Sequence, residues 1–280
     1  MGRLSGLIGR SLLVGLCLLG GAALAQREFR EYPSYERDWR DDARLPQNFD
    51  QPGEFVVGRL MFPQVRSGSV LGAGGGDWRQ GGTAWAVDYP AGDRTFAALL
   101  ERLTTIDVRP VEQPVNLDDD NDVFYWPFMI SGLVGAWDLS DAQALKLRDY
   151  LLRGGFLLCD SFYGSNEWFV FEESIKRVFP DRPIVELPDS HPIFHIVYDL
   201  TERPQVPTLQ HLRQGGYRND GAIPYWRAIL DDEDRVMVMI AFNNDIADGW
   251  QRADDPEYPQ DRSTLAIRLG VNFAVYALTH

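Results

Sequence analysis

Cysteine, positive charge and long apolar runs are all scarce in this sequence. The chain has only two cysteines, Cys17 and Cys159, among 280 residues. Its longest early apolar run, Ser11 to Leu19, falls short of the about 20 residues that a membrane-spanning helix needs. No later segment approaches that length, so we predict no membrane span.

The scarcity of positive charge argues against whole classes of partner. Lys and Arg number 27 against 41 Asp and Glu, which gives a formal net charge of −14. That balance disfavours nucleic acid and anionic lipid as partners. Solubility explains the acidity most simply, and an acidic docking surface is the alternative. Eight Trp and eleven Tyr are present, several beside Gly, Asp or Asn, which suits a rim for a sugar or another small polar ligand.

The N-terminal segment has the pattern of a secretion signal. Arg3 and Arg10 precede the apolar run, and Ala23-Leu24-Ala25 has the A-x-A form of a cleavage site. We predict that residues 1–25 are a signal peptide cleaved near Ala25, and that the protein is periplasmic or secreted. Only Cys159 remains after cleavage, which excludes an internal disulfide.

Beyond the signal peptide, composition divides the chain in two. Residues 26–52 are polar and aromatic without a sustained hydrophobic period, so we predict an extended arm that either packs on the domain or stays mobile. Residues 27–52 are also the candidate docking segment for an envelope protein. Residues 53–280 fit a single domain with a sizeable core.

Apolar runs alternate with segments of helical spacing over the predicted domain. The predicted strands are residues 54–62, 108–111, 123–130, 156–159, 184–187, 223–230 and 236–242. The predicted helices are residues 93–103, a segment capped by Ser140 and stopped by Gly154-Gly155, residues 167–179 and residues 263–278. This alternation predicts an α/β fold, with a mostly parallel sheet and helices on both faces. Ligands bind such sheets beyond the carboxyl ends of the strands, so the loops that follow strands are the candidate sites.

The first such loop is rich in glycine. Gly75, Gly76, Asp77 and Trp78 follow the first predicted strand, where backbone N–H groups are able to approach an anion. The loop has neither the Walker pattern nor G-x-G-x-x-G, so a tight turn is the alternative to phosphate binding. We assign these four residues to ligand binding.

The second loop, Cys159 to Gly164, is a sharp turn from strand to helix, where α/β enzymes place a nucleophile. Neither G-x-S-x-G nor G-x-C-x-G is present. Cys159 closes an apolar strand, which is typical of a buried small side chain. Asp160 and Ser161 are therefore the candidate catalytic residues of this turn, and Tyr163 is a candidate ligand contact.

The third loop carries two of the four histidines, His191 and His195. Imidazole is the natural general base near neutral pH, so His191 with Asp160 or Ser161 would form a hydrolytic site. We assign His195 to ligand binding. The spacing of four also suits zinc on a helix, but Pro192 disfavours a continuous helix there.

The fourth loop places Asp245, Asp248 and Trp250 after the last predicted strand. Carboxylates, amides and an indole suit a hydroxylated ligand or a hard cation, although Asx-rich turns have the same composition. Residues 118–122 resemble the start of a calcium loop, but Val123 occupies the position that requires glycine. We predict no metal site and no cofactor.

Five motifs together carry a family resemblance. They are Gly74 to Trp78, Leu147 to Leu157 with its Gly154-Gly155 pair, Tyr163-Gly164, His191 to His195, and Asp248-Gly249-Trp250. Across roughly residues 55–279 the chain resembles the bacterial family catalogued as domain of unknown function 4159. That family is similar in fold to class I glutamine amidotransferase-like and trehalose-utilisation-like proteins, which implies a flavodoxin-like sheet here.

The resemblance implies a fold but no activity, because the family is named for the lack of one. Aligned on the elbow of the amidotransferases, the position of their nucleophilic cysteine falls on Asp160, and Cys159 would point into the core. The family has two acidic residues at this turn, where this chain has Asp160-Ser161. A glutaminase mechanism is therefore disfavoured.

Three functions remain open at this point. The leading hypothesis is a periplasmic ligand-binding module for a carbohydrate-like or envelope ligand, which lacks the glutaminase nucleophile. The alternatives are a hydrolase that uses His191 with Asp160 or Ser161, and a scaffold of an envelope complex that docks through the arm. The arrangement of the four loops in space is the observation that bears most on this choice.

Overall fold

A computed structural model describes residues 29–36, 44–65 and 76–280 of the chain. The predicted signal peptide, residues 1–25, and Gly75 of the glycine-rich loop lie outside these residues. Within the described ranges, no helix is both long enough and apolar enough to cross a membrane.

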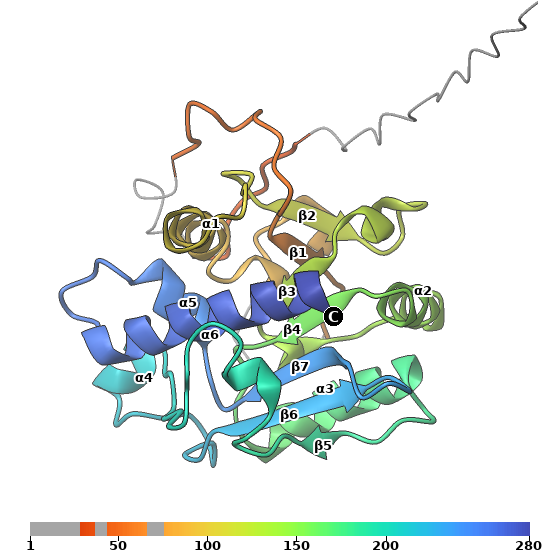
Figure 1. Cartoon of the computed structure of the whole chain (residues 1–280). Helices are drawn as coiled ribbons and strands as arrows, with labels where there is room; N and C mark the ends of the chain where they lie inside the picture. The colour runs from red at the N-terminus through yellow and green to blue at the C-terminus, as the bar shows by residue number, and fades with distance from the viewer. Residues whose placement is uncertain (1–28, 37–43, 66–75) are drawn as a thin grey trace, which may run out of the picture.

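A seven-stranded open sheet, in the order β2-β1-β3-β4-β7-β6-β5, forms the centre of the molecule (Figure 1). The five strands from β2 to β7 in this order run parallel, whereas β6 runs antiparallel to β7 and β5 antiparallel to β6. The sheet is therefore mostly parallel, as predicted. The strands are β1 (Gly58–Met61), β2 (Gln113–Asn116), β3 (Phe128–Ser131), β4 (Phe156–Cys159), β5 (Val185–Glu186), β6 (Tyr225–Leu230) and β7 (Val236–Phe242).

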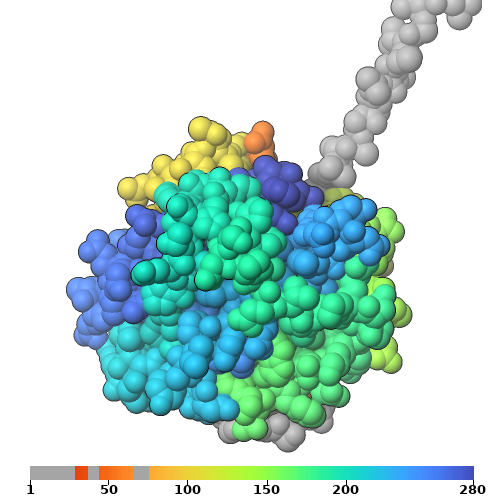
Figure 2. Space-filling view, turned by 60° about the horizontal axis from the view of Figure 1, so that its bottom comes forward, coloured from red at the N-terminus to blue at the C-terminus, as the bar shows by residue number. Residues whose placement is uncertain are grey.

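Helices cover both faces of the sheet. One face packs against α1, α5 and α6, and the other against α2 and α3 (Figure 1). The green-to-blue half of the chain, which follows β4, forms most of the face seen in Figure 2. The helices are α1 (Ala91–Leu103), α2 (Asp141–Leu152), α3 (Gly164–Val178), α4 (Leu209–Arg213), α5 (Ile246–Gln251) and α6 (Gln260–Thr279).

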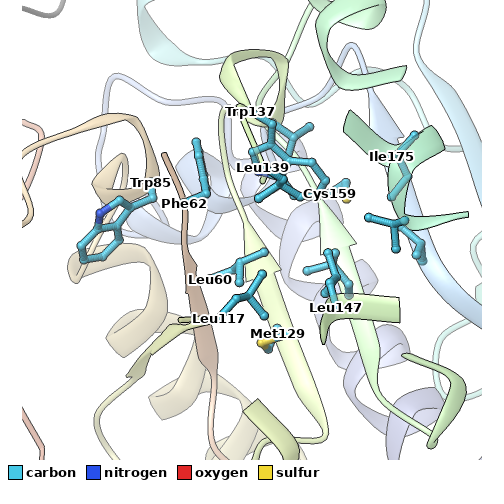
Figure 3. Packing of buried hydrophobic residues seen from close by; sticks show 14 of the residues in the cluster. Leu60, Phe62, Trp85, Leu117, Met129, Trp137, Leu139, Leu147, Cys159 and Ile175 are labelled. Carbon is cyan, nitrogen blue, oxygen red and sulfur yellow. The ribbon is translucent and has the colours of Figure 1, made fainter. Parts of the chain in front are cut away.

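Alternation along the central strands explains this two-sided cover. In β4, Leu157 and Cys159 belong to the apolar cluster under α2 and α3, whereas Phe156 and Leu158 belong to the cluster under α1 and α6. Figure 3 shows the first cluster, with Cys159 packed among large apolar side chains such as Leu139 and Trp137. A strand buried on both faces reads as a continuous apolar run, which is why β4 was visible in the sequence.

The arm lies on the domain where the structure describes it. The Tyr35 N–H donates to the carbonyl of Ala86 at 2.9 Å, and the Gly82 N–H donates to the carbonyl of Pro33 at 2.8 Å. Tyr32 packs edge-on against Trp85, with 5.6 Å between the ring centroids. Residues 29–36 are thus held against residues 81–89.

Several predicted elements differ from the structure in their bounds. The strand predicted at residues 54–62, for example, is β1 only from Gly58 to Met61. The strand predicted at residues 108–111 is a single bridge at Val108, and β2 begins at Gln113 instead. The strand predicted at residues 123–130 starts only at Phe128, because Asp122–Tyr125 forms a 3-10 turn. The helix predicted at residues 167–179 already begins at Gly164.

Candidate functional site

The loops that follow β4 and β7 meet at one edge of the sheet. These two strands pair in parallel, with Cys159 opposite Ile240, so their carboxyl ends are neighbours. Beyond them, Phe162 forms an antiparallel bridge with Asn244. The turn after β4 and the turn after β7 therefore face each other, as expected for a site at the carboxyl ends of parallel strands.

Ser161, in the turn after β4, has an unusual backbone conformation. Its φ is 63°, in the left-handed region that a residue with a side chain rarely adopts. Its N–H donates to the carbonyl of Asn244 at 3.0 Å, and its Oγ donates to Oδ2 of Asp245 at 2.5 Å. The family resemblance placed the elbow at Asp160, but the left-handed residue is Ser161, one position later.

Five carboxyl groups gather around this turn, and we call them the acidic cluster. Its members are Glu36, Asp88, Asp160, Asp245 and Asp248. The four aspartates are at most 4% exposed. Glu36 comes from the arm, and its Oε2 accepts a hydrogen bond from the backbone N–H of Asp88 at 3.0 Å. Elements far apart in the sequence thus supply four buried acids and one half-buried acid to the same place.

Two carboxyl oxygens of the cluster have no hydrogen-bond partner among the described residues. Oδ2 of Asp160 accepts from the backbone N–H of Ala247 at 2.9 Å, but its Oδ1 is unpartnered. Oδ2 of Asp88 is unpartnered as well. Buried polar atoms are rarely left unsatisfied, so these two oxygens mark the cluster as the candidate site.

Burial and mutual repulsion shift the titration of the cluster. Burial raises the pKa of Asp160 to about 7 and that of Glu36 to about 7. The pKa values of Asp88 and Asp245 are raised well above the ordinary range, first by burial and then by the neighbouring carboxylates. Burial also raises the pKa of Asp248, although Arg252 opposes the shift. The cluster therefore shares protons near neutral pH.

Positive charge near the cluster is mostly committed to other partners. Arg59 of β1 is fully buried, and its Nε and Nη2 bind the carboxylate of Asp93 at 3.1 and 2.7 Å. Arg252 pairs with Asp248 at 2.8 Å. Among the described residues, no ion pair neutralises the other four members of the acidic cluster.

One nitrogen of Arg59 nevertheless remains available. Its Nη1 is buried without a hydrogen-bond partner in the described part of the chain. A Cβ atom placed on Gly132, which follows β3, would lie 3.4 Å from this nitrogen and 3.8 Å from the Cβ of Ser161. The bare backbone of Gly132 thus lies beside both groups.

Tyr163 and His211 border the cluster on another side. The Tyr163 hydroxyl is buried without a described partner, and the pKa of Tyr163 is raised by burial and by the charges of Asp245 and Asp160. The ring of His211 packs edge-on against that of Tyr163, with 4.7 Å between centroids. Burial lowers the pKa of His211 to about 4, so this imidazole is neutral at physiological pH.

The two histidines predicted for the site lie elsewhere. His191 packs against Tyr276, whose hydroxyl accepts a hydrogen bond from the N–H of Val236 at the amino end of β7. That end of the strand is opposite to the acidic cluster, so His191 is not brought to Asp160 or Ser161. His195 binds the exposed carboxylate of Asp199 and the carbonyl of Asp189 on the surface.

The predicted tryptophans also point away from the cluster. Trp250 stacks on Phe96, with 4.1 Å between centroids, and its Nε1 donates to the carbonyl of Ala266. Trp78 is buried in the apolar cluster under α2 and α3. Asp77 caps the 3-10 turn that begins at Trp78, and its side chain is half exposed.

The structure therefore joins some of the predicted residues and adds others. It brings together Asp160, Ser161, Tyr163, Asp245 and Asp248. It adds Glu36, Arg59, Asp88 and His211, which sequence reasoning missed. Of these, only Arg59 could have been noticed in the sequence. It is a charged residue inside the apolar strand EFVVGRLMF, and a buried charge needs a partner.

No metal site is evident in the described residues. None of their His, Cys, Asp and Glu side chains form a group of three or more that is arranged to hold an ion. The cluster instead offers free carboxylate oxygens, a serine hydroxyl and one guanidinium N–H. These groups are suited to bind a polar ligand and to move protons.

A family model described as "Domain of unknown function (DUF4159)" matches residues 76–278 of the chain. The matched region contains Asp88, Ser161 and Asp245 and begins after Arg59. No curated protein matches the chain.

Proposed function

The chain belongs to the family described as domain of unknown function (DUF4159), and we propose that it is an exported protein that binds a small, carbohydrate-like ligand at the acidic cluster. Membership confirms the predicted resemblance to this family over residues 76–278, the part of the chain that the family model matches. Because the description of the family names no activity, the proposal rests on the chemistry of the site.

The observation that carries the proposal is the convergence of buried carboxyl groups that form no ion pair in the described part of the chain. Glu36, Asp88, Asp160 and Asp245 converge without an ion-pair partner among the described residues. Burying carboxylates in this way costs stability unless protons or a ligand compensate them. Groups of strongly shifted carboxyls are typical of functional sites.

The same carboxyl groups favour a ligand that donates hydrogen bonds. Sugar hydroxyls would donate to the free oxygens of Asp88 and Asp160. An ammonium group would add a charge-assisted bond to a carboxylate, which is about twice as strong as a neutral one. We therefore propose an amino sugar, or a ligand with the same amine and hydroxyl groups, as the best match.

The strand order supports a flavodoxin-like fold like that of the class I glutamine amidotransferases. The order β2-β1-β3-β4 equals the first four places of the flavodoxin-like order, and β7 takes the fifth. The acidic cluster lies beyond the carboxyl ends of the adjacent strands β4 and β7, where such folds bind ligands.

Calorimetry on the protein purified after export tests the proposal. The mass of the exported protein should correspond to a chain that begins near Gln26, as cleavage near Ala25 predicts. We expect glucosamine to bind, glucose to bind more weakly, and the glucosamine affinity to rise as the pH approaches about 7 from below, where Asp160 and Glu36 release protons while the sugar amine keeps its own. Asp245→Asn should weaken glucosamine binding by roughly tenfold or more, since it removes a carboxyl group that an ammonium ligand would hold in its ionised form.

Asp254→Asn is the matched control, because Asp254 is exposed just after α5 and undergoes the same chemical change. Its affinity should equal that of the wild type. The proposal would be wrong if the protein bound neither glucosamine nor glucose, or if Asp245→Asn and Asp254→Asn bound glucosamine with equal affinity. Tighter binding of magnesium chloride than of either sugar would reassign the cluster to a hard cation.

A further inference from the structure

We infer that Ser161 is a nucleophile, with Asp245 as its base, that hydrolyses an ester carried by the hydroxylated ligand of the acidic cluster. The inference rests on the proposed function, because it names the reaction that the binding site would perform on that ligand. It differs from the hydrolase expected from the sequence, because His191 takes no part.

The backbone of the turn is the first argument. Ser161 follows the central strand β4 and precedes α3, and its φ of 63° lies in the left-handed region. Glycine would adopt this conformation without steric conflict, whereas serine adopts it under strain. Strained residues of this kind gather at active sites, and a strand–turn–helix elbow is where α/β hydrolases hold their nucleophile.

The position of the base is the second argument. Oδ2 of Asp245 accepts the Ser161 hydroxyl hydrogen bond at 2.5 Å. Its Oδ1 accepts from the backbone N–H of Asp248 at 3.2 Å, so the first turn of α5 fixes the orientation of the carboxylate. A nucleophile within hydrogen-bond reach of a base that a third group orients is the arrangement of activated serines.

The unpartnered nitrogen of Arg59 is the third argument. Its Nη1 lies beside the Gly132 backbone, which itself lies next to the Cβ of Ser161. An ester carbonyl attacked by Ser161 develops negative charge on its oxygen. A buried guanidinium N–H with no other partner is suited to stabilise that charge.

The reaction balances with water as the only co-reactant. The Ser161 Oγ bonds to the acyl carbon while its proton moves to Asp245, and the carbonyl electron pair shifts onto the oxygen near Arg59. The tetrahedral intermediate collapses, the carbon–oxygen bond to the sugar breaks, and the released hydroxyl takes the proton from Asp245. Water then attacks the acyl carbon, gives a proton to Asp245, and releases the free acid as Ser161 regains its proton.

Protons held by the cluster control this chemistry. Several groups face Asp245. They are Ser161, Asp160 and Tyr163 after β4, Asp248 in α5 with its partner Arg252 just after that helix, Asp88 before α1, and Tyr258 after α5. Asp245 accepts a proton only when it is ionised, and the neighbouring carboxylates oppose its ionisation. The reactivity of Ser161 should therefore rise with pH.

Covalent labelling with diisopropyl fluorophosphate tests the inference on the full mature chain. The Ser161 Oγ would bond to phosphorus as fluoride leaves. Intact-mass analysis should show one added diisopropylphosphoryl group, and peptide mapping should place it on Ser161. Asp245→Asn should slow labelling by roughly 100-fold or more, which is the usual contribution of a general base.

Two serine variants control the experiment. Ser161→Gly should retain the fold, because glycine tolerates the left-handed turn, and should show no labelling. Ser165→Ala changes an exposed serine four residues later and should be labelled at the wild-type rate. Circular dichroism of both variants should match that of the wild type, which would show that an unlabelled variant is still folded.

Other results would overturn the inference. Label on any other serine, no label on the wild type, or a rate independent of pH would each remove the Ser161–Asp245 pair. Glucosamine binding without labelling would leave the proposed function intact and remove only the nucleophile. Labelling of Ser161 without sugar binding would instead remove the proposed ligand and keep the reactive serine.

Discussion

Ser161 combines a strained backbone with a hydrogen bond that offsets part of its cost. The left-handed conformation costs a residue with a side chain about 1–2 kcal/mol, and glycine avoids that cost. A single hydrogen bond returns about 1 kcal/mol. The two contributions can be separated, because glycine and alanine both remove the hydroxyl but differ in the backbone they tolerate.

We predict that Ser161→Gly is more stable than Ser161→Ala by roughly 1 kcal/mol, since only alanine retains the strain. The free energy of unfolding in urea measures the difference. Equal stabilities, or a more stable alanine variant, would show that the turn relaxes out of the left-handed region.

The sequence predicted members of the site only where they are neighbours along the chain. Asp160 and Ser161 are adjacent, and Asp245 and Asp248 share one short segment, so their place after apolar strands was visible. Glu36 and Asp88 reach the same site from distant segments, and only the tertiary fold reveals it.

At the scale of elements, the most accurate predictions were those of helix ends that neighbouring residues determine. Ser140 and Gln143 form a complete capping box, in which each side chain accepts from the backbone N–H of the other, and α2 begins at the next residue, Asp141. By contrast, β2 contains Pro114, which is atypical of strands and is tolerated here because β2 lies at an edge. The strand was therefore predicted at residues 108–111, just before its true position.

The loop after β7 illustrates the same limit. Its Asx-rich sequence resembles a plain turn, but Asp245 caps α5, a helix of six residues. The helix turns Trp250 toward Phe96 in the core, which removes the indole from the site. Short helices depend on tertiary packing more than on their own residues, so their sequences rarely predict them.

We predict that Ser140→Ala lowers the free energy of unfolding by about 1 kcal/mol, because α2 loses the side-chain acceptor at its amino end. Ser140→Thr should retain most of the stability, since threonine caps in the same way. Urea denaturation followed by circular dichroism measures both. An unchanged midpoint for the alanine variant would mean that packing alone holds the first turn of α2.

At the scale of the whole molecule, the acidic cluster links stability to pH. The pKa values of Asp160 and Glu36 rise from 3.8 and 4.5 to about 7 on folding, so the folded state binds more protons than the unfolded state between these values. The resulting stability is fully present below about pH 4 and is lost as the pH rises through about 7.

We therefore predict that the free energy of unfolding falls between about pH 5 and pH 8, with a slope on the order of 1 kcal/mol per pH unit. Asp160→Asn should flatten the slope, because asparagine stays neutral throughout. Urea denaturation at several pH values measures it. The exposed Asp181, whose pKa is lowered to about 2 beside Arg148, titrates below this window and is the matched control as Asp181→Asn. A slope near zero would mean that the cluster is solvated, because solvated carboxyl groups keep their ordinary pKa values.

The two borders of the sheet have a consequence for how copies of the chain behave in a crowded solution. Open sheets expose unpaired N–H and carbonyl groups at their outer strands, which are templates for polymerisation. Here one outer strand, β5, has only two residues, and the other, β2, carries Pro114, which has no N–H to offer. Both borders are thus poor templates, and an open sheet of seven strands is protected from growing into a fibre.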